Sequence, residues 1–306
     1  MANYIIRRLI YSVITLLLLS LTIFLIVRAT GDPARILAGA EATPEEIAQI
    51  RADLGLDRSL VAQYGSFMND LLHGDFGRSF NFRAPVLDVY MDRLPRSLQL
   101  GTAAFLLSLI IGIPSGVLAA VRPHFWLTKI LKGISLTGVS VPNFVIATAM
   151  IYLFSVRLRW LPTSGTGSWK HFIMPTIALG WYFAASTMRL VQSSMLEVMG
   201  GEYVKLARLK GVPEWLVVTK HALKNSLIPV LTLAGVNFVV MVNVAVIIES
   251  IFSWPGVGEL VAIGINVRDF PLVQGVVLLA GVMVVFVNLV LDVLYAWLDP
   301  RIRLNR

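Results

Sequence analysis

The side chains that could carry chemistry in this chain of 306 residues are few and lie far apart. Its four histidines form no H-E-x-x-H pair and it has no cysteine, so the sequence indicates neither a zinc site nor a thiol nucleophile. It also lacks a G-x-x-x-x-G-K-[ST] run, the loop that holds ATP phosphates in P-loop proteins. We therefore expect no metal and no cofactor in this chain, and an energy source in another subunit or in an ion gradient.

Ser115 is the remaining candidate nucleophile, because an intramembrane serine protease needs a serine in a G-x-S-G turn. The run Gly112-Ile113-Pro114-Ser115-Gly116 has one residue too many for that turn, and no histidine inside an apolar stretch accompanies it. We interpret Pro114 and Gly116 instead as residues that bend and pack a helix. The sequence thus predicts that the chain is not an enzyme.

The composition indicates a membrane protein. Apolar residues make up 57% of the chain and charged residues only 14%, whereas a soluble domain has roughly 45–50% and about 25%. The net charge of +8 does not favour a nucleic-acid partner, because the lysines and arginines lie in short gaps between long apolar runs. These values exclude a disordered chain and a typical soluble enzyme.

Six apolar windows are long enough to cross about 30 Å of hydrocarbon as helices. We therefore predict an all-α polytopic membrane protein with six transmembrane helices. The windows are about residues 9–27, 98–121, 134–156, 172–188, 227–248 and 272–298. A cleaved signal peptide is the alternative for the first window, but its length and the lack of a small-x-small cleavage site before Arg28 favour a retained helix.

The positive charges predict the orientation in the membrane. Fourteen lysines and arginines lie in the two termini and in the gaps after the second and fourth windows, against four in the short gaps on the other side. Because short cytoplasmic loops carry the excess of these residues, we expect both termini in the cytoplasm. The long gap at residues 29–96 then lies outside.

This external gap is too long for a bare connection and indicates short helices. Thr43 and Glu46 have the spacing of a capping box around Pro44, and Gly55 is a stop signal for that helix. Two more helices are expected, one with the stripe Leu60, Tyr64, Phe67 and Leu71 before Gly74, and one from Pro85 to Leu94. The residues leave open whether this segment is a lid on the membrane core or a docking or gating surface.

The internal gap at about residues 192–225 is polar and basic but keeps the apolar spacing of helices. One short helix is expected from Glu202 until Gly211, and a second from Pro213. Ala207 and Gly211 leave little side chain between the backbone and a neighbour, which favours close docking into a partner's groove. An amphipathic helix that lies on the bilayer is the alternative.

Few polar side chains fall inside the apolar windows. Pro142 predicts a break in the third window, whose free carbonyls should face a cavity or another helix. The candidates for lining a translocation path are Ser140, Pro142, Asn143, Asn237, Asn243 and Glu249. Hydrogen bonding between helices is the alternative for the asparagines. Ionisable groups at mid-depth are scarce, which argues against a carrier driven by an ion gradient, the second candidate class.

At the internal gap the sequence resembles a known family. Residues Glu202 to Pro229 resemble the cytoplasmic "EAA" loop of ABC-importer permeases, and Ala207-Arg208-Leu209-Lys210-Gly211 is similar to the version in the dipeptide/oligopeptide/nickel permease family. Eight further motifs are similar to those of the family and occur along the chain in the family's order. They are Gly31-Asp32-Pro33-Ala34, Leu54-Gly55-Leu56-Asp57, Gly74-Asp75-Phe76-Gly77, Arg93-Leu94-Pro95, Arg189 to Glu197, Phe252 to Gly258, Arg268-Asp269-Phe270-Pro271 and Asp299-Pro300-Arg301-Ile302-Arg303. Leu206 and Leu209 depart from the pattern, because the family more often has smaller or polar residues there.

The resemblance implies a type I ABC importer permease subunit of the dipeptide-permease B type, which would place the chain in the bacterial cytoplasmic (inner) membrane. The implied segments are an amino-terminal transmembrane helix (1–28), an external or periplasmic helical segment (29–96), a five-helix permease core (97–299) that contains the coupling loop 192–225, and a cytoplasmic tail (300–306). Peptides or peptide-like solutes are the expected cargo. Glutathione, opines, haem and nickel chelates are the alternatives.

The resemblance also implies partners. These are a second homologous permease subunit, two cytoplasmic ATPase subunits that bind ATP and Mg, and an external solute-binding protein; no nucleic acid is expected. The residues expected to dock the ATPase are Glu202, Tyr203, Ala207, Arg208, Lys210, Gly211, Trp215 and His221. Asn225 and Pro229 would form the elbow between this loop and the following helix.

Overall fold

The computed structural model describes residues 2–39, 42–53 and 55–298. The described part is helical, and its β-structure is limited to one isolated bridge between Arg78 and Pro85. The chain divides into two compact units. The first comprises Met1–Pro95 with Gly256–Arg306, and the second comprises Arg96–Pro255.

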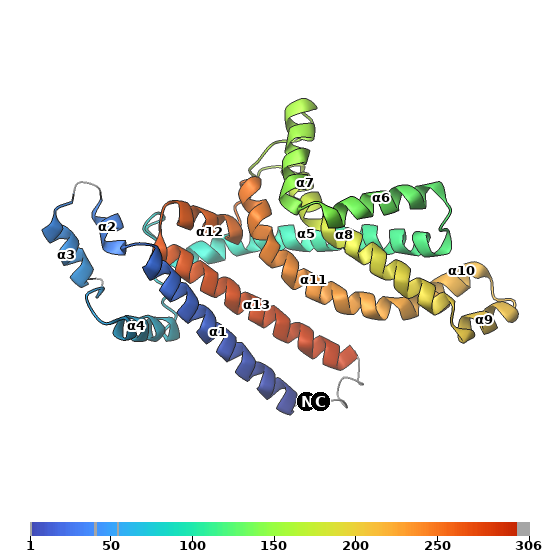
Figure 1. Cartoon of the computed structure of the whole chain (residues 1–306), viewed down its shortest axis with the longest axis horizontal. Helices are drawn as coiled ribbons and strands as arrows, with labels where there is room; N and C mark the ends of the chain where they lie inside the picture. The colour runs from blue at the N-terminus through green and yellow to red at the C-terminus, as the bar shows by residue number, and fades with distance from the viewer. Residues whose placement is uncertain (1, 40–41, 54, 299–306) are drawn as a thin grey trace. The chain divides into compact units, whose positions relative to one another are not determined.

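The first unit is built on two long apolar helices. Helices α1 (Ala2–Thr30) and α13 (Phe270–Leu298) lie side by side (Figure 1). Ile23 and Val27 of α1 are buried with Phe270 of α13 in one core. The outer faces of both helices remain exposed and apolar. Helices that are apolar all round are typical of membrane spans.

The segment that is predicted to be external forms short helices, as expected. They are α2 (Pro33–Ala38), α3 (Pro44–Asp53) and α4 (Leu60–Leu72). The capping box is confirmed, because the Thr43 N–H donates to Glu46 Oε2 (2.8 Å) and the Glu46 N–H donates to Thr43 Oγ1 (3.3 Å). Gly55 follows α3 with φ +62°, a left-handed conformation that favours glycine at helix ends. Leu54, which the sequence places on the apolar face of this helix, lies outside the described residues.

Helix α4 packs on α1 through the predicted apolar stripe. The rings of Tyr64 and Phe67 lie 5.2 Å and 5.8 Å from the ring of Phe24. The hydroxyl of Tyr64 is also 2.9 Å from that of Ser20. Leu60, the first residue of the stripe, differs from the rest because it is exposed.

The prediction of a separate helix from Pro85 to Leu94 is wrong. Those residues form the first turns of α5 (Val86–Val121), which continues through Pro95 as one helix. Buried side chains of these turns pack with α12 (Val257–Asn266) and α13. We attribute the continuous helix to this packing, which offsets the one hydrogen bond that Pro95 removes.

The second unit is arranged around α8. Its elements after α5 are α6 (Trp126–Ser140), α7 (Asn143–Met150), the π-helix η1 (Ile151–Arg157), α8 (Trp169–Met199), α9 (Glu202–Leu209), α10 (Glu214–Leu216), the π-helix η2 (Val217–Leu223) and α11 (Lys224–Ile251). Helix α8 packs against α6, α7 and α11 (Figure 1). Leu179 and Phe183 of α8 share the main core of this unit with Met241 and Ile248 of α11.

The predicted break at Pro142 is confirmed. Helix α6 ends at Ser140 and α7 begins at Asn143, with a bend of 113° between them. Proline disfavours the helical conformation in the residue before it, so Val141 is extended. The third apolar window therefore forms a bent pair of helices rather than one straight span.

The count of six spans is approximate. Four described helices are long and apolar enough to cross a membrane, and the bent pair makes a fifth if it counts as one span. Helix α8, which holds the fourth window, is not among them. Its small and polar residues, such as Thr176, Gly180 and Thr187, are buried against neighbouring helices. A helix enclosed by other helices does not need an apolar surface toward lipid.

Candidate functional site

The predicted docking loop is a helical hairpin at the start of α11. Helix α9 ends in a Schellman motif, because the Gly211 N–H donates to Arg208 O (2.9 Å) and the Val212 N–H to Ala207 O (3.2 Å). Gly211 has φ +76°, which explains the glycine at this position. Pro213 then precedes α10, as the sequence predicts.

An ion pair fixes the two arms of the hairpin. The Arg208 guanidinium donates to both carboxylate oxygens of Glu214, at 3.1 Å and 2.6 Å. Hydrogen bonding between the two side chains raises the pKa of Arg208 and lowers that of Glu214, as expected for a charged pair. Because both side chains are exposed, the pair contributes at most about 1 kcal/mol and acts mainly on the geometry of the turn. A second pair joins Lys205 to Glu202 (2.8 Å) within α9.

The hairpin has its own small core. Val204 and Ala207 of α9 are buried against Val217 of η2. Ala207 is only 8% exposed, so its small side chain is explained by packing inside the hairpin. This differs from the sequence interpretation, in which Ala207 left its backbone open to a partner. Gly211, in contrast, is exposed, and a Cβ there would have no atom within 4 Å.

The outer face of the hairpin carries apolar side chains that the described part of the chain leaves exposed. Leu206, Leu209 and Trp215 are 53%, 84% and 67% exposed. We call these three residues the docking face. The basic Lys210 and the acidic Glu202 lie exposed in the same hairpin. Leu206 and Leu209 are the two departures from the family pattern, and apolar side chains at exposed helical positions are typical of a contact surface.

The predicted elbow brings three expected site residues together. Asn225 Nδ2 donates to the Tyr203 hydroxyl (3.1 Å) and to His221 O (3.0 Å), and so ties α9 to the start of α11. Ser194 Oγ of α8 donates to the carbonyl oxygen of Ser226, the residue of α11 that follows Asn225 (3.1 Å). The hairpin is thus hydrogen-bonded to α11, and it packs against α8 through apolar side chains of η2. Pro229 lies one turn further in α11, where it has no N–H to donate to the Asn225 carbonyl.

The hairpin lies at one end of the second unit with the end of α5. Ala120 of α5, Val191 and Met195 of α8, and Val218 and Ala222 of η2 form one buried cluster. The basic gaps that follow the second and fourth apolar windows therefore lie at the same end of the second unit.

The residues predicted to line a path do not form one cluster. Ser140 and Pro142 are exposed at the break between α6 and α7, and Asn143 beside them is half-buried. Asn237 is half-buried in the middle of α11, while Glu249 is 1% exposed near its end. Asn243 lies in α11, but its side chain is outside the described part of the structure. The role of these residues remains a prediction.

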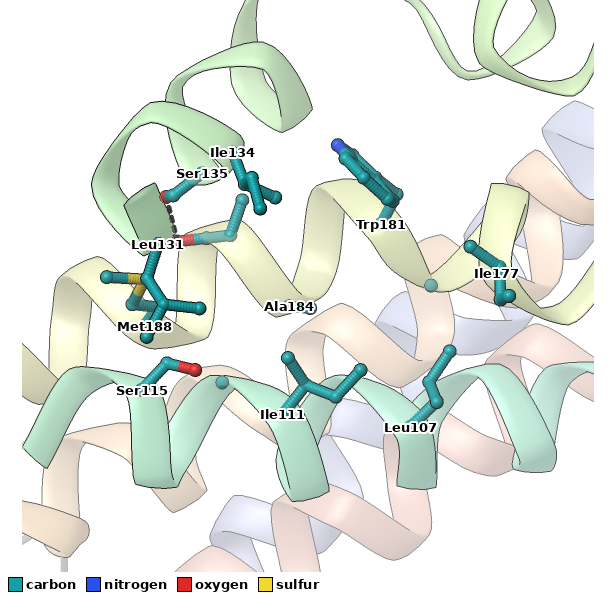
Figure 2. A pocket seen from close by; sticks show the side chains of 13 residues that line it. Leu107, Ile111, Ser115, Leu131, Ile134, Ser135, Ile177, Trp181, Ala184 and Met188 are labelled. Atoms are coloured by element: carbon teal, nitrogen blue, oxygen red, sulfur yellow. Dashed lines mark hydrogen bonds between the residues drawn. The ribbon is translucent and has the colours of Figure 1, made fainter. Parts of the chain in front are cut away.

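An apolar cavity of about 340 Å³ lies between α5, α6 and α8 (Figure 2). Ile111 of α5, Leu131 of α6 and Trp181 of α8 are among its walls, and Ser135 Oγ donates to Ala185 O (3.3 Å) beside it. Ser115 lines the cavity, and the other lining residues are apolar apart from Ser135. No side chain of this cavity is a base that could activate Ser115.

Comparison with known proteins gives two family matches. Residues 112–304 match the model described as binding-protein-dependent transport system inner membrane component, and residues 1–101 match the model of the amino-terminal part of such a membrane component. The chain is 39% identical over 304 residues to the glutathione transport system permease protein GsiC of Escherichia coli strain K12, covering 99% of both chains. It is 38% identical to the protein of the same name from Salmonella choleraesuis strain SC-B67, again over 99% of both.

Solved structures give the fold. An inward-facing structure of the MetNI methionine ABC transporter matches with a TM-score of 0.57 at 19% identity, over 70% of this chain and 97% of that one. A structure of an amino acid ABC transporter with histidines matches with a TM-score of 0.54 at 14% identity, over 68% and 93%. Together, the family matches and the 39% identity show that the chain belongs to the binding-protein-dependent transport system inner membrane components, the permease subunits of ABC importers.

Proposed function

We propose that this chain forms half of the translocation pathway of an ATP-driven importer for peptides or peptide-like solutes. The observation that supports its coupling role is the exposed docking face of Leu206, Leu209 and Trp215, on a hairpin that packs on α8 and is hydrogen-bonded to α11. An apolar surface of this kind on a short polar hairpin is suited to a protein partner.

The names of the relatives support glutathione, one of the alternatives given above, and with it a peptide-like cargo. The proteins at 38–39% identity are named for glutathione, which is itself a short peptide. This supports a peptide-like solute over an opine, haem or a nickel chelate. An external binding protein would deliver the solute, in line with the description of the matching family.

The importer requires further subunits. A permease of an ABC importer works with ATPase and binding-protein subunits. We propose a second homologous permease as the other half of the path, and two ATPases that bind ATP and Mg at their own sites, with no cofactor in this chain. Nucleotide-driven movement of the ATPases would shift the hairpin, and its packing on α8 and its hydrogen bonds to α11 would pass that shift to the spans.

We place both termini and the hairpin in the cytoplasm of a bacterial cell. The excess of basic residues in the termini and in two internal gaps supports this orientation. The buried cluster that joins the end of α5 to the hairpin supports it as well, because it puts those two basic gaps at one end of the second unit.

Reconstitution into proteoliposomes tests this function. With the ATPases, the second permease and the binding protein present, we expect uptake of radiolabelled glutathione or a short peptide only when ATP is supplied. Uptake that a proton or sodium gradient drives in vesicles without any ATPase would contradict the proposal and favour the carrier.

The Gly211 position tests how closely the ATPase docks. We expect Gly211→Val to reduce ATPase co-purification and transport at least about tenfold, because a β-branched residue is strained by more than 1 kcal/mol at φ +76°. Asparagine tolerates this backbone conformation, so Gly211→Asn should keep the turn but still weaken co-purification, since its side chain would stand between the backbone and the partner.

Membrane insertion and thermal unfolding of both variants should stay close to those of the unmodified chain. Full co-purification with Gly211→Asn would mean that only the shape of the turn matters, and full co-purification with Gly211→Val would contradict the docking role of this turn.

A further inference from the structure

A second pocket, of about 470 Å³, lies in the first unit on the predicted external side. The end of α1, the turn after α3, helix α4, the loop at residues 75–77 and the start of α13 form its walls. Its size falls in the range of sites for small ligands. The charged and amide side chains on its surface include Arg28, Asp53, Arg58, Asp70, Asp75 and Gln274.

Gln274 marks the buried part of this pocket. The residue is 7% exposed, and its Nε2 has no hydrogen-bond partner among the described residues. Buried polar groups are nearly always hydrogen-bonded, and leaving one unpaired costs about 1–3 kcal/mol. A carboxylate or carbonyl oxygen that enters the pocket would accept this hydrogen bond.

Arg28 adds a fixed positive charge to the pocket. Its Nε donates to Gln63 Oε1 (3.0 Å), and its guanidinium lies 4.0 Å from the centre of the Phe24 ring. Gln63 in turn donates through Nε2 to Leu56 O (3.2 Å) and Arg58 O (2.9 Å). The half-buried arginine is therefore held in place before any ligand binds, which favours recognition of an anion.

Three carboxylates give the exposed part of the pocket the opposite charge. Asp53, Asp70 and Asp75 are all exposed. Asp75 Oδ1 accepts from the Gly77 N–H (2.8 Å), which fixes one carboxylate. Arg58, which is also exposed, offsets one of the three charges, and the remaining negative charge attracts an ammonium group and repels a simple anion.

We infer that this pocket binds both charged ends of a zwitterionic solute such as a short peptide. A carboxylate lies toward Gln274 and Arg28, and an ammonium group lies near the three aspartates. The inference rests on the proposed peptide-like cargo and gives the permease an external contact with it that is separate from the binding protein.

Equilibrium dialysis tests this site on the assembled transporter in nanodiscs, without binding protein or nucleotide. Radiolabelled trialanine is the probe, with N-acetyl-trialanine and trialanine amide as competitors that lack one charge each. We expect saturable binding of trialanine, and competition at least about tenfold weaker from either blocked form, since each loses a charge-assisted hydrogen bond.

Two variants test the residues. Gln274→Met keeps the side-chain volume and Asp70→Asn changes an exposed residue, so both should fold, and both should weaken binding at least about fivefold. Glu45→Gln is the matched control, because Glu45 is an exposed acid of the same segment that does not line the pocket. Its binding should equal that of the unmodified chain.

The absence of saturation up to about 10 mM, which exceeds the range of a millimolar site, would overturn the inference. So would binding that neither Gln274→Met nor Asp70→Asn changes. ATP-driven uptake measured in parallel separates the two proposals: uptake without binding contradicts this pocket only, and binding without uptake contradicts the proposed function only.

Discussion

Gly116→Val is expected to prevent stable packing of α5 on α8. A Cβ at position 116 would lie 2.6 Å from Met188 O and 2.6 Å from Val191 Cβ, and real Cβ atoms do not approach other atoms so closely. The carbonyl belongs to the backbone of α8, so no rotamer change relieves the clash and the helices must separate. We expect a loss of about 3 kcal/mol or more in the free energy of unfolding.

Gly112, one turn earlier on α5, also lies directly against the backbone of α8. A Cβ there would lie 2.7 Å from Thr187 Cβ and 2.9 Å from Ala184 O. The two glycines thus form a G-x-x-x-G contact, in which two helices of a membrane protein approach backbone to backbone. The combined Gly112→Val and Gly116→Val variant should fail to yield monodisperse protein.

Gly133→Val is the matched control for these variants. Gly133 lies in α6, and a Cβ there would have no atom within 4 Å. Thermal unfolding in detergent should show a midpoint lower by about 5–10 °C for Gly116→Val and unchanged or slightly raised for Gly133→Val. Equal midpoints for the two variants would show that α5 and α8 do not pack as described.

Much of the local structure could be predicted from the sequence, because it depends on neighbouring residues. The capping box at Thr43 and the stop at Gly211 are set by hydrogen bonds within a few residues. Pro142 breaks the third window through its own ring, whatever surrounds it. These signals are local, and a sequence displays them directly.

Features that depend on tertiary contacts could not be predicted in the same way. The sequence predicts a separate helix that ends before Pro95. In the structure the first turns of α5 pack on α12 and α13, and α5 continues through Pro95. The small residues of α8 lower its hydropathy, while its position among other helices removes the need for an apolar surface. Neither effect is visible without the neighbours.

In the candidate site, too, local features could be predicted and features that depend on tertiary contacts could not. The two arms of the hairpin and the elbow at Asn225 follow from spacing and from the family resemblance. The inward orientation of Ala207 and the exposure of Leu209 could not be derived, since each depends on which face of α9 packs on η2. The pocket around Gln274 brings together residues more than 200 positions apart, and no pattern in the sequence marks it.

Asp269→Asn is expected to release the loop at residues 78–85 in the first unit. Asp269 is 1% exposed, and its Oδ2 accepts from the Ser79 hydroxyl (2.6 Å) and from the Asn81 N–H (2.9 Å). Its Oδ1 accepts from the Leu272 N–H (3.1 Å), so the same carboxylate caps the start of α13. An asparagine keeps the shape but turns an NH₂ group toward one of these donors.

The expected loss is about 2–3 kcal/mol, because a buried donor then faces another donor and hydrogen bonds to a charged group disappear. Cleavage by trypsin measures the release of the loop directly, because Arg78 and Arg83 are exposed on either side of Ser79 and Asn81. Local opening made easier by that amount should accelerate cleavage after these arginines by about tenfold or more.

Asp88→Asn is the control, because Asp88 is an exposed acid in the first turn of α5 and its removal affects only the interaction with the helix dipole, worth about 0.5 kcal/mol. Cleavage of Asp88→Asn should therefore stay near the rate of the unmodified chain. If Asp269→Asn is also cleaved at that rate, the buried carboxylate does not hold the loop, and the contact between residues 78–85 and the start of α13 must depend on apolar packing alone.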